Sequence, residues 1–181
     1  MSCSPYRRQD RNKTARMLCG LLLGGGLAGT GCTGYRIGTT LPPGIRSVYV
    51  PVFENRTDEP QLEAKATQAT VAELQRDGTL RIEREEQADA VLHVVLLGIT
   101  EEPLRYQRGE RDAAAEYRLR MQAEITLVRQ ATGEAVVDRV RVGGRETFEF
   151  AGTMSASRQT ALPGASTDLA RRIVTRLAEH W

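Results

Sequence analysis

The chain begins with a segment that has the organisation of a secretory leader, and this restricts the folded protein to the residues after it. Five basic residues and one acid, Asp10, occupy residues 1–16, and a short apolar stretch covers 17–28. Three small residues complete the segment. A basic region, an apolar region and a small-residue cleavage site are typical of a secretory signal. We therefore expect residues 1–31 to be a signal peptide that is absent from the mature protein.

Cys32 stands directly after the expected cleavage site, and this position makes the leader resemble that of a bacterial lipoprotein. In such signals the thiol of the first mature residue receives a diacylglycerol, so Cys32 is the expected lipidation site. One position departs from the usual pattern, because Gly29 stands where these signals usually carry leucine. Plain secretion and a non-secreted protein with an unusual N-terminus therefore stay open as alternatives.

Two further interpretations of the leader fit less well. A transmembrane helix needs about 20 apolar residues, and the 17–28 stretch is shorter and rich in glycine. The pair Arg7-Arg8 is similar to the start of a twin-arginine signal, but residues 9–11 do not continue that pattern.

The mature chain, residues 32–181, has the length of one domain of ordinary size. The leader holds five of the 25 Lys and Arg residues and one of the 23 acids, which leaves 20 basic and 22 acidic residues and a net charge of −2. A nucleic-acid-binding protein would show a basic excess, which is missing here. Cys3 and Cys19 leave with the leader, so Cys32 has no partner for an internal disulfide.

Two segments open the mature chain. Residues 32–44 are rich in Gly, Thr and Pro and predict an extended, lipidated spacer before a single domain over 45–181. The β-branched run 45–52 predicts a first strand, 53–57 a loop, and 80–83 a short second strand.

Two helices are expected. The first starts at Asp58, where a capping acid precedes a proline, and ends before Gly78. The second has an apolar stripe with a four-residue spacing and ends the chain. Ser166 or Thr167 is its expected cap, and Asp168 suits the positive end of its dipole.

The middle of the chain predicts further strands. Residues 90–99 are almost all apolar, so both faces of this strand should be covered, one of them by a loop or by a partner protein. The charged stretch 103–113 predicts a mobile loop. Two alternating strands come next, and the pair Gly143-Gly144 predicts a bulge or bend in the second of them. The resulting fold class is α+β, a two-layer structure in which two helices pack on one face of a mixed or antiparallel sheet of four to five strands.

The register of the two alternating strands can be predicted from the turn 131–134 between them. A tight turn centred on Thr132-Gly133 places Ile125 opposite Val140 and Ala123 opposite Val142. Apolar residues then meet apolar residues, which supports this pairing.

The mature chain offers few residues for chemistry. His93 lies in the apolar strand and is expected to be a packed or hydrogen-bonded core residue, and His180 lies in the last helical turn. The adjacent carboxylates Glu85-Glu86 and Glu101-Glu102 are expected to be solvated pairs. No metal site, cofactor site or catalytic residue is predicted, so the chain is not expected to be an enzyme.

One face of the hairpin is rich in arginine. The five arginines expected on the side away from the core are Arg118, Arg120, Arg139, Arg141 and Arg145. They could bind a phosphate or another anion through bidentate contacts. Alternatively they form an ordinary solvated face, on which Arg141 lies opposite Glu124.

Several segments, in this order, resemble the LPS-assembly lipoprotein (LptE-like) family. The similarity covers nearly all of residues 32–181. The segments that carry it are Gly34-Tyr35, Leu41-Pro42, Ile45 to Thr57 with its Pro-Val-Phe-Glu-Asn-Arg-Thr end, Leu62-Glu63 with Thr67, Ala88 to Leu92, and Leu169 to Val174 with Trp181.

This resemblance implies an outer-membrane lipoprotein, anchored by its lipid on the periplasmic side and without catalytic activity. Such a protein binds a large outer-membrane β-barrel as a plug, supports its assembly and takes part in lipopolysaccharide transport. The expected partners are that barrel, the membrane, and lipopolysaccharide or a related anionic glycolipid; no cofactor and no nucleic acid is expected.

The start Val48 to Asn55 is also similar to two other groups, the lipoprotein activators of peptidoglycan synthases and the curli-secretion lipoproteins. An envelope lipoprotein that regulates a peptidoglycan synthase or a secretion pore is therefore the alternative. The spacer spans about 40 Å at full stretch, which favours a partner in the same membrane.

Overall fold

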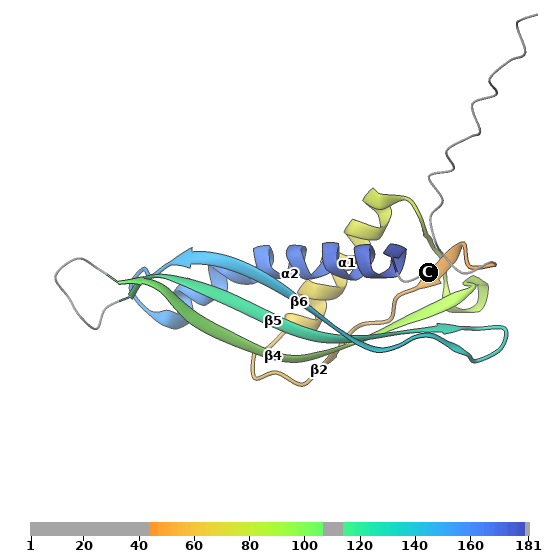
Figure 1. Cartoon of the computed structure of the whole chain (residues 1–181), viewed down its shortest axis with the longest axis horizontal. Coiled ribbons are helices and arrows are strands. Elements are labelled where there is room, and N and C mark those ends of the chain that lie inside the picture. The colour runs from red at the N-terminus through yellow and green to blue at the C-terminus, as the bar shows by residue number, and fades with distance from the viewer. Residues whose placement is uncertain (1–43, 107–113, 180–181) are drawn as a thin grey trace, which may run out of the picture. The chain divides into compact units, whose positions relative to one another are not determined.

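A six-stranded sheet and two long helices make up the computed structural model, which describes residues 44–106 and 114–179. Figure 1 shows their arrangement. The elements in chain order are β1 (Ser47–Tyr49), β2 (Glu54–Asn55), α1 (Leu62–Asp77), β3 (Arg81–Ile82), the 3₁₀ turn η1 (Glu85–Gln87), β4 (Ala90–Tyr106), β5 (Ala114–Arg129), β6 (Ala135–Glu149) and α2 (Met154–Glu179).

The sheet is mixed, with the strand order β3-β1-β4-β5-β6. β1 runs parallel to β3 and β4, whereas β4, β5 and β6 form an antiparallel meander. The expected α+β class is confirmed. The sheet has six strands, not four or five, because Glu54–Asn55, expected in a loop, pairs with β4 in parallel.

The predicted hairpin register is confirmed. Ile125 pairs with Val140 and Ala123 with Val142 across β5 and β6. The turn contains Gly133 at φ 68, a left-handed conformation that glycine adopts without steric cost. Next to the turn the pairing differs, since Val128 pairs with Ala135 and Leu127 with Val137, and two register shifts lie between these pairs and the predicted one.

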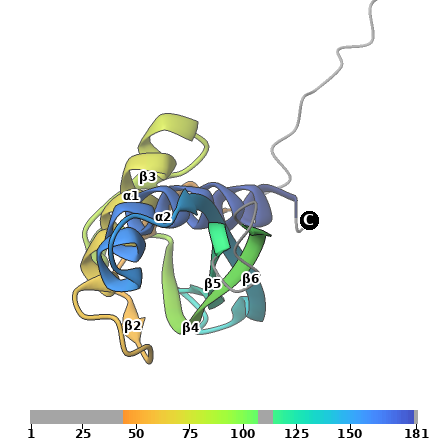
Figure 2. The ribbon, with the colours of Figure 1, turned by 90° about the vertical axis from the view of Figure 1, so that its left-hand side faces the viewer.

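Both helices pack on the same face of the sheet, as Figures 1 and 2 show. Alternate residues of the long strands point toward them and are buried, for example Leu92, Leu96, Leu119 and Ile125. The expected two-layer arrangement places the hydrophobic core between the helices and this face. The opposite, outer face of the sheet is only partly covered.

His93 shows that the described part of the chain does not fully cover the second face of β4, so cover by a partner protein stays a prediction. His93 is exposed on the outer face, opposite Thr126, and is therefore not a core histidine. Val91 next to it is buried and Val95 is half-buried, so the cover on this face is partial. β4 also extends to Tyr106 and so includes part of the expected 103–113 loop; residues 107–113 lie outside the described residues.

The two helices begin at residues other than those predicted. α1 begins at Leu62, after Gln61 in a left-handed conformation, so Asp58 does not cap it, while Gly78 ends it as expected with φ 72. α2 begins at Met154 and contains Pro163. Ser166 and Thr167 are consequently interior residues of α2 and not its cap.

Gly144 allows close packing and does not mark a bulge. Gly143 and Gly144 pair regularly with Gln122 and Met121. A Cβ atom at residue 144 would lie 2.6 Å from the Leu169 backbone nitrogen, so only glycine lets α2 approach β6 this closely. The register shifts of β6 lie elsewhere, between the partners of Ile125 and Val128.

Candidate functional site

A groove of about 640 Å³ lies between the edge of β6 and helix α2. β6 is the terminal strand of the sheet, so its outer edge faces this groove. We call it the basic groove. The residues that line it are Arg141, Val142, Gly143, Asp168, Arg171, Arg172, Thr175 and Arg176.

The direction of α2 determines which residues meet in the basic groove. Gly144 packs on Leu169. Residues 141–143, which precede Gly144 on β6, line the groove together with residues that follow Leu169 on α2, between Arg171 and Arg176. α2 therefore runs antiparallel to β6 along this edge. Leu169, Ile173 and Leu177 are buried, so Arg172 and Arg176 extend from a different side of the helix.

Among the residues described, Asp168 is the only acid that lines the basic groove, and its carboxylate already has two partners. Its Oδ2 atom accepts a hydrogen bond from the backbone N–H of Arg145 at 2.9 Å and another from Nε of Arg172 at 3.0 Å. Within the described part of the chain, Arg141, Arg171 and Arg176 form no ion pair. The groove thus combines four arginines with one aspartate, which favours an anionic ligand.

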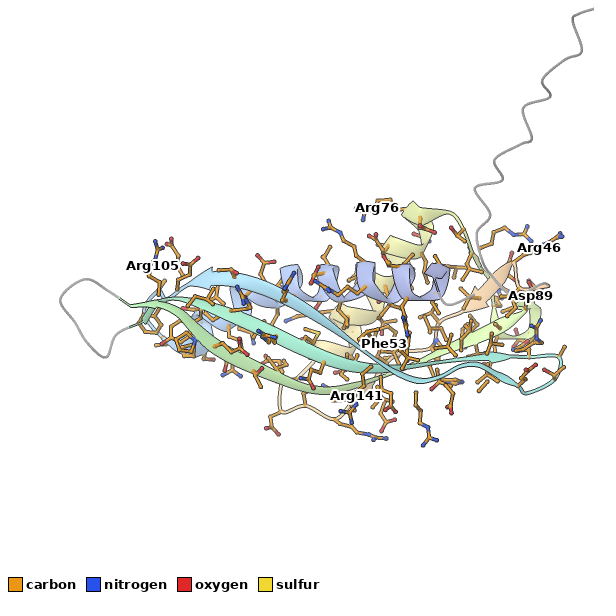
Figure 3. The ribbon with its side chains drawn as sticks, viewed as in Figure 1. Arg46, Phe53, Arg76, Asp89, Arg105 and Arg141 are labelled. Carbon is orange, nitrogen blue, oxygen red and sulfur yellow. The ribbon has the colours of Figure 1, made fainter. Side chains whose placement is uncertain are left out.

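The five arginines expected on one face have different surroundings, and Arg145 lines the second cavity described below. Arg120 forms an ion pair with Glu102 at 2.8 Å, and Arg139 one with Asp138 at 3.4 Å. Arg141 lines the basic groove, and its side chain lies on the outer side of the sheet (Figure 3). Arg118 lies next to Glu102 in the register.

A second cavity of about 290 Å³ adjoins the basic groove, with which it shares Gly143 and Arg172. Arg120 and Arg145 also line it. The structure therefore brings Arg120, Arg141 and Arg145 near the arginines of α2, whereas Arg118 and Arg139 line neither cavity.

The contribution of α2 to this site was not predicted from the sequence. Arg171, Arg172 and Arg176 were expected in a helix, but nothing in the sequence shows which strand that helix borders. The four-residue spacing of Asp168, Arg172 and Arg176 does indicate one face of a helix. A charged face beside an apolar stripe is, however, also typical of ordinary solvent exposure.

A separate polar cluster joins α2 to the segment before α1. Glu59 is 6% exposed and accepts a hydrogen bond from the Gln159 side chain. Arg158 lies 3.4 Å from Glu59 and 2.8 Å from Glu101, and the shorter contact is an ion pair without hydrogen-bond geometry. This cluster connects three elements through one buried and two partly buried charges, which points to a structural role.

The remaining candidate residues are separated. Glu101 points toward Arg158 on the helix side and Glu102 toward Arg120, so these adjacent carboxylates have different partners. In residues 44–106 and 114–179, no group of His, Cys, Asp and Glu side chains is arranged to hold a metal ion. None of the helices in these ranges is long and apolar enough to cross a membrane. Cys32, His180 and the spacer 32–44 lie outside the described residues, apart from Gly44 at the end of the spacer.

Comparison with protein families gives one match over most of the domain. The family model described as LptE, lipopolysaccharide-assembly, matches residues 45–177. This range contains every strand and both helices except the last residues of α2. No curated protein matches the chain.

Solved structures with a TM-score above 0.5 share the fold at low sequence identity. A protein from Xanthomonas campestris is 11% identical, with a TM-score of 0.51 over 78% of this chain and 90% of its own. A hypothetical protein from Chlamydia trachomatis is 10% identical, with a TM-score of 0.51 over 74% of this chain and 96% of its own. A minor lipoprotein from Acinetobacter baumannii is also 10% identical, with a TM-score of 0.48 and coverage of 75% and 94%.

Proposed function

Because the chain belongs to the lipopolysaccharide-assembly (LptE) family, we propose that it is an outer-membrane lipoprotein that binds a β-barrel partner and takes part in lipopolysaccharide transport. The observation that carries this proposal is the family match over residues 45–177, which covers nearly the whole α+β domain. The protein acts by binding, as an assembly factor and plug of the barrel, and it is not an enzyme.

Membrane attachment is the first element of the proposal. The leader 1–31 and the adjoining Cys32 support cleavage and lipidation. Each buried CH₂ of a lipid chain contributes about 0.8 kcal/mol, and two or more chains give stable anchoring. The lipid then holds the domain on the periplasmic side of the outer membrane and raises its effective concentration near a membrane partner.

The second element is recognition of an anionic glycolipid. The basic groove supports it, because three of its arginines have no acidic partner among the residues described. Arginine matches the oxygens of phosphate with a planar, bidentate set of donors. Of the predicted arginine face, Arg141 lines the basic groove, and Arg145 and the ion-paired Arg120 line the adjoining cavity, whereas Arg139 lines neither.

The third element is the barrel partner. The outer face of the sheet supports it, since His93 is exposed and Val95 only half-buried there, and Val52 in the segment between β1 and β2 is 70% exposed. A partly apolar, uncovered sheet face suits contact with another protein. The long β4–β5 hairpin would place such a face along the wall of a lumen.

Affinity purification from detergent-solubilised membranes tests the proposed function. We expect the tagged full chain to capture an outer-membrane β-barrel together with lipopolysaccharide. An unrelated outer-membrane lipoprotein with the same tag is the control. Recovery of a penicillin-binding protein in place of a barrel would instead support the peptidoglycan-synthase alternative, and capture of neither would contradict both.

A further inference from the structure

The carboxylate of Asp168 is itself an anion bound at the edge of β6. It is held between an outward N–H group of the strand, that of Arg145, and a guanidinium of the helix, that of Arg172. Charge-assisted hydrogen bonds of this kind are about twice as strong as neutral ones. The junction of β6 and α2 therefore already contains one bound carboxylate, supplied by the protein itself.

An outward N–H group of β6 faces the helix again two residues earlier, at Gly143. Backbone N–H groups of a strand alternate in direction, so the N–H of Gly143 points outward like that of Arg145, about 7 Å away. A step of four residues along α2 advances by about 6 Å and leads from Asp168 to Arg172 and then to Arg176. The strand and helix repeats match closely enough for Gly143 to face the Arg172 and Arg176 turns.

Beside Gly143 the helix presents hydrogen-bond donors, whereas beside Arg145 it presents an acceptor, the Asp168 carboxylate. The position equivalent to Asp168 is taken by Arg172, and the next by Arg176. Nε of Arg176 is buried and has no hydrogen-bond partner within the described ranges. Hydrogen-bond donors on the strand thus face donors on the helix, and a buried donor without an acceptor is costly.

We propose that the basic groove binds the phosphate monoester of a sugar phosphate, held by the N–H of Gly143 and the guanidinium groups of Arg171, Arg172 and Arg176. The groove of about 640 Å³ exceeds the volume of a phosphate and leaves room for the attached sugar. The assignment of this sugar phosphate to a lipopolysaccharide head group rests on the proposed function. Asp168 borders the site and limits its affinity by repulsion.

An acidic peptide that adds a strand to β6 is less well supported. The free edge is interrupted on both sides of residues 141–143. Asp168 occupies the N–H of Arg145, and Arg139 has a φ of 45 where β6 changes register. Only a very short peptide could pair between these two points, whereas a single anionic group needs no ladder of hydrogen bonds.

Binding of lipopolysaccharide to the purified lipidated protein in detergent tests the proposal. Phosphorylated lipopolysaccharide is compared with an enzymatically dephosphorylated sample, and glucose 1-phosphate is added as a competitor. We expect the double variant R171Q/R176Q to bind the phosphorylated form about tenfold more weakly, since each lost charge-assisted bond contributes at that scale. R139Q, which alters an ion-paired arginine of β6 outside the groove, should bind like the wild type.

The affinity of the D168N variant distinguishes a phosphate site from a purely structural role of the groove residues. Removal of its charge should tighten binding of the phosphorylated form several-fold, whereas damage to the groove would weaken it. Competition by glucose 1-phosphate would assign the site to the phosphate monoester itself; loss of binding in R171Q/R176Q without such competition would assign it to the intact head group. Circular dichroism of each variant confirms folding.

Equal affinity of wild type and R171Q/R176Q for the phosphorylated form would overturn this inference, as would equal binding of the dephosphorylated sample. Displacement by a glutamate-rich peptide but not by either phosphate ligand would also overturn it, in favour of strand addition. Capture of the β-barrel by the wild type is measured separately, so the proposed function can stand when the phosphate site fails.

Discussion

Asp89 binds Ser47 through both its side chain and its backbone. Oδ2 of Asp89 accepts hydrogen bonds from the backbone N–H and the hydroxyl of Ser47, each at 2.9 Å, while the N–H of Asp89 donates to the same hydroxyl at 3.0 Å. The N–H of Arg46 also donates to Oδ2, at 2.8 Å. Figure 3 shows Arg46 and Asp89 together where the first strand begins, so this cluster connects β1 to the start of β4.

The first prediction is that Asp89 makes stability depend on pH. The Arg46 N–H, and after it the Ser47 hydroxyl, holds the pKa of Asp89 below its ordinary value. A carboxyl whose pKa is lowered on folding binds its proton more readily in the unfolded state, so its stabilisation is complete above the ordinary value and is lost as pH falls through the lowered one. Urea unfolding between pH 7 and pH 3 should therefore show a steeper loss for the wild type than for D89N.

D89A provides the companion measurement, because it removes the acceptor as well as the charge. We expect a loss of about 1–2 kcal/mol in the free energy of unfolding at pH 7, a value limited by the partial exposure of the site. D89N keeps an amide oxygen that can accept the same bonds and should lose less. Equal pH profiles for wild type and D89N would contradict the role of the charge.

The second prediction concerns the contact of Gly144 with α2. G144A should lower the free energy of unfolding by about 3 kcal/mol, because the added methyl group would overlap the backbone of Ala165 and Leu169. Gly98 is a matched control in β4, where a Cβ atom meets nothing within 4 Å. G98A should change stability by less than about 0.5 kcal/mol. Similar thermal unfolding of the two variants would contradict the close-packing explanation.

The long hairpin shows what local sequence can predict. The turn at Gly133 and the alternation of apolar residues on each side were sufficient for the correct pairing of Ile125 with Val140. Both signals are local, because a tight turn fixes the register of the strands it joins. The parallel strand β2 carries no such signal, since its two residues pair with a strand that lies some 40 positions later.

Helix α2 and the basic groove show why the remainder could not be predicted. Pro163 and Gly164 are typical of a loop, so the sequence pattern placed the start of the helix after them. Gly164 is packed against Glu146 of β6, which is a tertiary contact. The groove likewise depends on the direction in which α2 crosses β6, and sequence periodicity does not contain that direction.

The third prediction separates a buried charge from an exposed one. E59A should lower the free energy of unfolding by about 2–3 kcal/mol, because it leaves the half-buried Arg158 without one of its two carboxylates and Gln159 without its acceptor. The pair of Arg120 and Glu102 is 48% and 45% exposed, so E102A should cost less than about 1 kcal/mol. Chemical denaturation of both variants checks the difference, and an equal cost would remove the structural role given to Glu59.

The fourth prediction concerns Cys32, which lies outside the described residues. C32S removes the thiol that would carry the lipid and leaves the domain 45–181 unchanged, so the folded protein should move from the membrane fraction to the soluble envelope fraction. Because a single acyl chain anchors a protein only weakly, mass spectrometry of the N-terminal peptide should show more than one chain on the wild type. C3S and C19S are matched controls within the leader and should leave the protein membrane-bound. An unmodified wild-type Cys32, or membrane retention of C32S in the absence of the barrel, would contradict lipid anchoring.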